Sequence, residues 1–184
     1  MKLRIVIAVL MLVLLVGCSS KYNYHVEPTP LKEGITKYSI DRVTVNLSFG
    51  HGNLNDGRFE NQEQLTESFR KAILKNLKEK NLLAETKEKA DALIQVNVDY
   101  KRVFNWGGKA LSKPKVSYDV NVYNKESVNL ADFGLEPFTT SYGTFGDMAV
   151  GIQIAAFKWG KQGELKDVNT VSKIITTDLA GLGD

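Results

Sequence analysis

Three stretches of the chain alternate between apolar and polar residues, the period expected of a strand that buries one face. Their apolar positions are Val43, Val45, Leu47 and Phe49, then Ile94, Val96, Val98 and Tyr100, and finally Val116, Tyr118, Val120 and Val122. Residues 105–114, between the second and third stretches, contain two adjacent glycines and a proline, which is typical of a long hairpin loop. We therefore predict that these two strands pair antiparallel.

Two other segments repeat apolar residues every three or four positions, which predicts amphipathic helices. In the first, Asn61 is a suitable N-cap with Gln64 three residues later, an arrangement close to a capping box. The second covers residues 164–179 and is followed by Gly181 as a stop signal. The apolar positions are Leu65, Phe69, Ala72, Ile73 and Leu77 in the first helix, and Leu165, Val168, Val171, Ile175 and Leu179 in the second.

The region between the third strand and the last helix has a weaker pattern. Residues 138–145 fit a fourth strand because aromatic residues recur there. Residues 148–159 fit either an alternating strand or a helix of small residues. Gly151 disfavours a helix interior, so the strand is the preferred interpretation.

These elements predict an α+β fold: a mainly antiparallel sheet with two amphipathic helices packed on its apolar face. Residues 41–184 are long enough for one core and are predicted to form a single domain. Residues 18–40 contain prolines and show no periodicity, as expected of a tether. Tyr22, Tyr24 and Tyr38 favour the alternative, an arm docked on the domain or at a membrane interface.

The chain begins with a short basic segment followed by an apolar run. Lys2 and Arg4 precede residues 5–16, a run of 12 residues. Crossing about 30 Å of hydrocarbon takes about 20 residues, so this run is too short to span a membrane but suits a signal peptide. It ends in Leu-Val-Gly-Cys at positions 15–18, which resembles the lipobox of bacterial lipoproteins.

The lipobox resemblance implies that Cys18 receives a diacylglycerol and that residues 1–17 are removed as a signal peptide. Acylated Cys18 would then attach the chain to a membrane. Ser19 stands where an aspartate favours retention in the inner membrane, so the implied location is the outer membrane, with the domain facing the periplasm. The alternative is an uncleaved anchor with an incidental cysteine, which would also place the domain outside the cytoplasm.

Removal of residues 1–17 changes the charge and leaves no free thiol. It takes away two of the 24 basic residues and none of the 21 acidic ones, leaving 22 against 21 and a net charge of +1. This balance does not suit a polyanion binder, and we expect no nucleic-acid partner. Cys18 is the sole cysteine in the sequence, so its acylation excludes disulfides, cysteine metal sites and cysteine nucleophiles.

Candidate catalytic residues are few. His25 lies in the 18–40 segment, which leaves His51, in a glycine-rich loop, as the candidate general base. A hydrolase built on His51 would need a nucleophile and an orienting acid, and the sequence has no glycine-flanked serine elbow. The loop also lacks the alternating oxygen ligands of a calcium loop. We therefore predict no enzyme activity, no cofactor and no metal site.

Two surfaces are candidates for binding. The first is the hairpin loop with its flanks, where basic residues and aromatics interleave as they do in sites for anionic lipid or glycan; the alternative is a solvated loop with its tryptophan folded onto the core. Its candidate residues are Lys101, Arg102, Trp106, Lys109, Lys113 and Lys115. The second is the polar face of the sheet, which suits a sugar, a partner subunit or water alone. It comprises Asn46, Gln95, Asn97, Asp99, Ser117, Asp119, Asn121 and Tyr123.

The order of elements behind a lipobox resembles the small α/β periplasmic domains of envelope lipoproteins of the curli-export type, over about residues 41–123. The resemblance rests on pattern, implies a fold and no site residues, and the sequence lacks the membrane-inserting strand pair of a secretion pore. The leading hypothesis is a non-enzymatic, membrane-anchored envelope lipoprotein that assists assembly, transport or a protein complex through an envelope protein partner. The alternatives are a glycan- or lipid-binding module using loop 101–115, and a hydrolase built on His51.

Overall fold

The computed structural model describes residues 21–50, 57–105 and 110–183. Along the chain, the strands and helices are β1 (Asn23–Tyr24), β2 (Tyr38–Phe49), α2 (Gln62–Glu79), β3 (Ala92–Arg102), β4 (Phe104–Asn105), β5 (Ala110–Leu111), β6 (Lys115–Tyr123), β7 (Asn129–Thr139), α3 (Gly143–Ala155) and α4 (Lys161–Ala180). None of the helices within the described ranges is both long enough and apolar enough to span a membrane.

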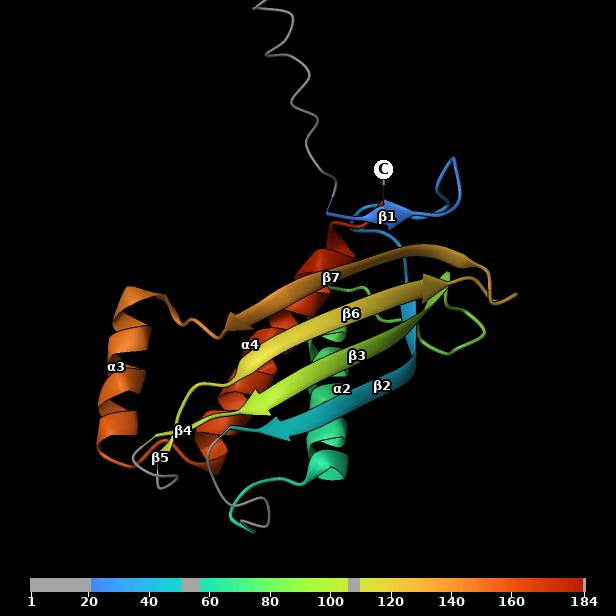
Figure 1. The fold of residues 1–184 in the computed structure, drawn as a ribbon. Helices are drawn as coiled ribbons and strands as arrows, with labels where there is room; N and C mark the ends of the chain where they lie inside the picture. The colour runs from blue at the N-terminus through green and yellow to red at the C-terminus, as the bar shows by residue number, and fades with distance from the viewer. Residues whose placement is uncertain (1–20, 51–56, 106–109, 184) are drawn as a thin grey trace, which may run out of the picture.

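The main sheet has five strands in the order β1-β7-β6-β3-β2 (Figure 1). The predicted hairpin is confirmed, because β3 and β6 pair antiparallel with Ile94 opposite Val122 and Tyr100 opposite Val116. The first predicted strand, β2, lies parallel to β3, and α2 makes the crossover between them. The other pairs are antiparallel, which confirms an α+β fold with a mainly antiparallel sheet.

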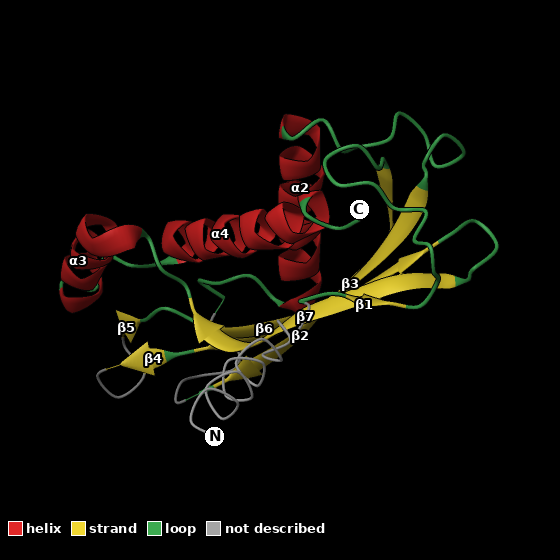
Figure 2. Cartoon of the chain, turned by 90° about the horizontal axis from the view of Figure 1, so that it is seen from above, coloured by secondary structure: helices red, strands yellow, loops and turns green. Residues whose placement is uncertain are grey.

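Helices α2 and α4 lie on one face of this sheet (Figure 2). The capping box of α2 forms as predicted: the Asn61 side chain accepts the Gln64 N–H at 2.9 Å, and the Gln64 side chain accepts the Asn61 N–H at 3.0 Å. Both helices bury their apolar stripes against the inward positions of the strands, with Phe69 and Ile175 fully buried. Among the described residues, no helix lies on the opposite face of the sheet (Figure 2).

Two sequence-based predictions in the C-terminal third are wrong. The fourth strand, β7, begins at Asn129 and ends at Thr139, so most of it precedes the predicted residues 138–145. Residues 148–155 belong to α3 and do not form a strand. The strand interpretation required Val150 and Ile152 to share a buried face, yet Val150 is buried and Ile152 is exposed.

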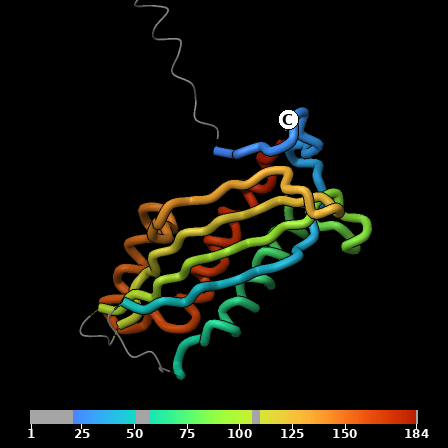
Figure 3. The backbone as a smooth tube through the Cα atoms, turned by 45° about the vertical axis from the view of Figure 1, so that its right-hand side comes forward, coloured from blue at the N-terminus to red at the C-terminus, as the bar shows by residue number. Residues whose placement is uncertain are grey.

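Residues 21–37 form a docked arm, the second of the two alternatives for this segment, and residues 38–40 already belong to β2. Leu31 is 2% exposed, and Tyr22 donates a hydrogen bond from its hydroxyl to the Asp178 carbonyl at 2.9 Å. The Tyr24 hydroxyl accepts the Gly183 N–H at 3.0 Å. The arm therefore lies beside the C-terminal end of the chain (Figure 3).

Candidate functional site

Arg102, predicted to lie on a binding surface, is buried and points into the fold. Its side chain is 3% exposed, and its Nε donates to Glu164 at 2.7 Å while a terminal nitrogen donates to the Glu60 carbonyl at 2.7 Å. The guanidinium carbon lies 5.3 Å from the ring centroids of both Phe49 and Phe59. Arg102 is thus a structural residue, and its assignment to a lipid or glycan site is wrong.

Glu164, the partner of Arg102, lies in the first turn of α4 and is fully buried. Burial raises the pKa of the Glu164 carboxyl, and the hydrogen bond and charge of Arg102 oppose that rise. One carboxylate oxygen, Oε2, has no hydrogen-bond partner among the described residues. The ion pair joins the end of β3 to the start of α4.

Lys113, a second predicted binding residue, pairs with Asp147 of α3 and is largely covered. Asp147 also accepts hydrogen bonds from the Ser141 hydroxyl at 2.7 Å and from the Tyr142 N–H at 3.0 Å. Led by Lys113, these contacts lower the pKa of Asp147 to about 2. Lys113 therefore connects the segment before β6 to the N-terminal part of α3.

A second buried carboxylate, that of Asp167, contacts the segment just before α3. Asp167 of α4 accepts hydrogen bonds from the Thr140 hydroxyl and, at 2.6 Å, from the Tyr142 hydroxyl. Burial raises the pKa of Asp167, and these donors oppose the rise. The contacts fix the chain between β7 and α3.

A small apolar cluster, separate from the main core, supports α3 from inside. Its buried members are Phe104, Leu111, Val150 and Trp159. Phe104 and Leu111 are paired residues of the β4-β5 hairpin. Figure 2 shows α3 beside the end of the sheet, beyond the layer formed by α2 and α4. The cluster and the polar contacts together hold α3 in a defined position at this end of the molecule.

The outward face of α3 is apolar. Phe145 is 84% exposed, Met148 57% and Ile152 64%, and their three- and four-residue spacing places them on one stripe of the helix. Phe157, just after the helix, is 55% exposed. The polar side chain of Asp147 is instead turned toward the protein. Sequence reasoning missed this surface, which we call the α3 apolar face and define as these four apolar residues.

The uncovered face of the main sheet is polar, as the alternation of its strands predicts. Asn97 is paired with Asp119 across β3 and β6, and the Asn46 amide donates to Asp99 at 2.9 Å. Lys101 and Lys115 are directly opposite each other on this face and are exposed. They are the two residues of the predicted basic loop that the structure leaves accessible. Trp106, Lys109 and the loop residue His51 lie outside the described residues.

A hollow of about 490 Å³ lies on this polar face beside β1. Asp119 and Asp132 contribute carboxylates to it, and Lys21 and Asn23 lie at its arm side. A Cβ added to Gly134 would lie 2.7 Å from the Asp119 carboxylate and from a backbone carbonyl, so the close strand approach here requires glycine. The hollow offers hydrogen-bonding groups that are suited to a polar partner.

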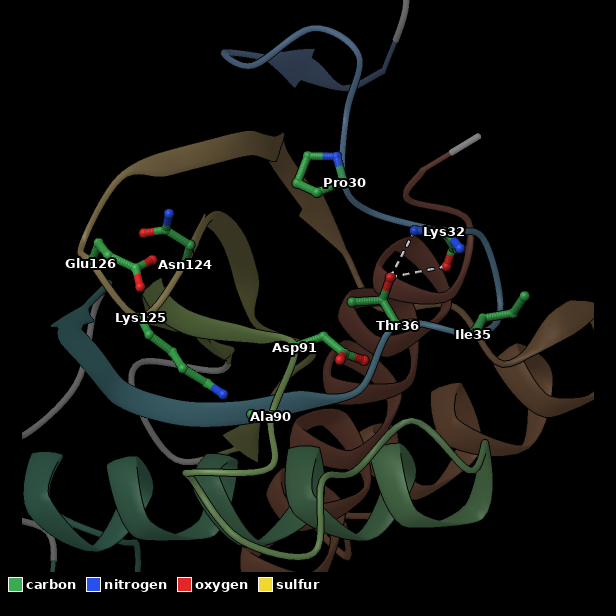
Figure 4. A pocket seen from close by; sticks show the side chains of 9 residues that line it. All are labelled: Pro30, Lys32, Ile35, Thr36, Ala90, Asp91, Asn124, Lys125 and Glu126. Atoms are coloured by element: carbon green, nitrogen blue, oxygen red, sulfur yellow. Dashed lines mark hydrogen bonds between the residues drawn. The ribbon is translucent and has the colours of Figure 1, made fainter.

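A second hollow, of about 520 Å³, lies at the end of the molecule where the arm meets the β6-β7 turn (Figure 4). Its polar groups are largely used within the fold. Thr36 exchanges hydrogen bonds with the Lys32 backbone, Asp91 accepts the Lys37 N–H at 2.8 Å, and the Lys125 amine donates to the Glu88 carbonyl. The lining residues are Pro30, Lys32, Ile35, Thr36, Ala90, Asp91, Asn124, Lys125 and Glu126. Within the described ranges, no group of three or more histidine, cysteine or acidic residues is placed to hold a metal ion.

Comparison with known proteins gives distant matches to solved structures. No protein-family model and no curated protein matches the chain. The PelC dodecamer from Paraburkholderia phytofirmans shares 11% sequence identity with this chain at a TM-score of 0.36, and the match covers 75% of this chain and 95% of that one. A point variant of the same dodecamer shares 11% identity at a TM-score of 0.37, and the match covers 74% of this chain and 96% of that one. A candidate lipoprotein from Caulobacter crescentus shares 10% identity with a TM-score of 0.35, over 73% and 87%. These values are too low to carry a functional argument.

Proposed function

We propose that this protein is a non-enzymatic lipoprotein of the cell envelope, anchored through acylated Cys18 in the outer membrane, and that it assists an envelope protein complex. The docked arm is the observation that carries the proposal. Lys21, three positions after Cys18, is already fixed by its ion pair with Asp178 at the C-terminal end of α4. Three residues span at most about 10 Å, so a lipid on Cys18 would hold the domain next to the membrane.

A domain held this closely presents its surfaces near the membrane. The polar sheet face is the surface proposed for the protein partner, because it is open and its amide and carboxylate groups are aligned across the strands. Asp132 illustrates the point: Asn23 donates to it at 2.9 Å, His25 contacts it, and these groups lower the pKa of Asp132. It is therefore ionised at neutral pH and contributes negative charge to this face.

The proposal is tested in intact envelopes of the producing bacterium. Metabolic acyl labelling is expected in the wild type and absent in Cys18→Ala. A photo-crosslinking residue at Asn97, on the polar sheet face, is expected to give an adduct of one defined mass. The matched position is Lys75 on the solvated face of α2, whose side chain is 68% exposed and should give none. A wild-type protein that takes up no acyl label would contradict the proposal, and so would the same crosslinked products at positions 97 and 75.

A second candidate function is glycan or anionic-lipid binding by the basic residues of segment 101–115. Lys101 and Lys115 favour it because they form an exposed cationic pair on the polar sheet face. The test substitutes both lysines with glutamine and measures binding to envelope glycan and to anionic vesicles. Binding that is unchanged in the double variant removes this candidate, and a hydrolytic activity lost in His51→Ala would replace both proposals with an enzyme.

A further inference from the structure

We propose that the α3 apolar face inserts into the headgroup region of the membrane, so that the domain is attached at two points: the lipid on Cys18 and α3. This inference rests on the proposed function, because it requires the lipid anchor. It adds a binding site, a ligand class and an orientation for the domain.

The outward side of α3 differs from that of a surface helix in a water-soluble domain, because apolar residues lie on it as well as on the inner side, where Val150 is buried. A surface helix of a water-soluble domain turns its apolar stripe toward the core and its charged residues toward water. In α3, Asp147 is held inward by Lys113, whereas Phe145, Met148 and Ile152 point outward. The stripe is thus matched to an apolar environment outside the protein.

The length of α3 fits a helix that lies in a membrane surface. Its 13 residues extend over about 20 Å, which is too short to cross about 30 Å of hydrocarbon. An interfacial helix instead buries one apolar face at the boundary between headgroups and acyl chains, and aromatic side chains are favoured at that depth. Phe145 and Phe157 supply such side chains at the two ends of the face.

Charge near α3 also favours a lipid surface with anionic headgroups over a cationic or neutral partner. Three lysines follow the helix closely, and all are exposed: Lys158, Lys161 and Lys166. The acidic residues nearby are engaged within the fold, Asp147 with Lys113 and buried Glu164 with Arg102. An apolar helix flanked by lysines is complementary to a bilayer that contains anionic headgroups.

The position of the anchor makes this insertion possible. Lys21 lies at the C-terminal end of α4, through Asp178, while α3 precedes the N-terminal end of the same helix. The 20 residues of α4 span about 30 Å, so the two attachment points are separated by a comparable distance. One lipid anchor leaves the domain free to rotate about Cys18, and a second contact this far away would fix its orientation.

The test uses the full chain, produced with its acyl groups and reconstituted in vesicles of phosphatidylethanolamine and phosphatidylglycerol. Because Cys18 is the sole cysteine and would be acylated, Met148→Cys introduces one free thiol for an environment-sensitive fluorophore. Lys71→Cys is the matched control, because Lys71 is 73% exposed on α2. We expect blue-shifted emission, quenched by brominated acyl chains, at position 148 and aqueous emission at position 71.

Each other outcome overturns the inference. Aqueous emission at both positions shows that α3 does not enter the bilayer. Blue-shifted emission at position 148 without quenching by brominated lipid shows that another protein surface, such as a second copy, covers α3. The mass of the Cys18 adduct and flotation with the vesicles report separately on the anchor, so a floating, acylated chain with aqueous emission at position 148 defeats this inference and leaves the proposed function standing.

Discussion

Replacing Arg102 with methionine is expected to destabilise the fold strongly, because it breaks a buried ion pair from one side. Methionine retains much of the aliphatic volume of arginine, so the cavity term is small. The loss comes from three contacts: the Nε–Glu164 bond at 2.7 Å, the bond to the Glu60 carbonyl at 2.7 Å, and the guanidinium packing on two phenylalanine rings. Removing one partner of a buried pair costs about 3–5 kcal/mol. That is a large fraction of the roughly 5–15 kcal/mol that stabilises a domain.

A double variant distinguishes the net contribution of the ion pair to stability from the cost of leaving one buried charge without a partner. Arg102→Met combined with Glu164→Met removes both charges, and replacing a buried pair by apolar groups is often neutral or stabilising. The double variant is therefore expected to recover most of the loss. Urea unfolding followed by near-ultraviolet circular dichroism gives the free energies, since Trp159 lies in the adjacent apolar cluster.

The pH dependence of the stability that Arg102→Met loses, measured as the free energy of unfolding, provides an independent check. Burial already raises the pKa of Glu164, and loss of the arginine removes the groups that oppose the rise. A carboxyl whose pKa is higher in the folded state binds its proton more tightly there, so stability falls as pH rises from the unfolded pKa, about 4.3, through the folded value. The loss of stability in Arg102→Met, relative to the wild type, is expected to be smaller at pH 4 than at pH 7. A single-variant loss below about 1 kcal/mol, or a double variant no more stable than the single one, refutes the reasoning.

Three further predictions concern the α3 end of the molecule. Asp147→Asn removes a carboxyl whose pKa is lowered to about 2, so the wild type should lose stability between pH 4 and pH 2 and the variant should lose less, as urea midpoints will show. Gly163→Ala places a Cβ 2.4 Å from the buried Trp159 ring and should destabilise by about 1–3 kcal/mol despite alanine's better helix propensity. Gly151→Ala meets nothing within 4 Å and should raise the thermal midpoint, gaining up to about 1 kcal/mol. Equal effects of the two alanine substitutions would contradict the packing argument.

Much of the fold could be predicted because its signals are local. The capping box at Asn61 and the stop at Gly181 lie at the ends of strongly periodic helices. The hairpin of β3 and β6 follows from two alternating stretches joined by a glycine-containing loop. The parallel pairing of β2 and β3 was not predicted, because the order strand, helix, strand leaves open which strands become neighbours.

The site could not be predicted because it depends on contacts distant in sequence. Arg102 and Lys113 were assigned to a basic surface, and each has an acidic partner at least 34 residues away. One available signal was overlooked: Glu164 and Asp167 interrupt the buried side of α4 and are spaced three residues apart. Buried acids require partners, so these two positions pointed to inward-facing donors.

The error in α3 shows why a hydrophobic pattern leaves orientation open. Phe145, Met148 and Ile152 have helical spacing, which defines a stripe but not the environment it faces. The environment is decided by the other side of the helix, where Asp147 finds Lys113 and Val150 enters the apolar cluster. An exposed stripe held in place by such contacts is a stable feature of the fold. The proposed membrane contact rests on this exposure, because a lipid on Cys18 would bring a bilayer, an apolar environment, within reach of α3.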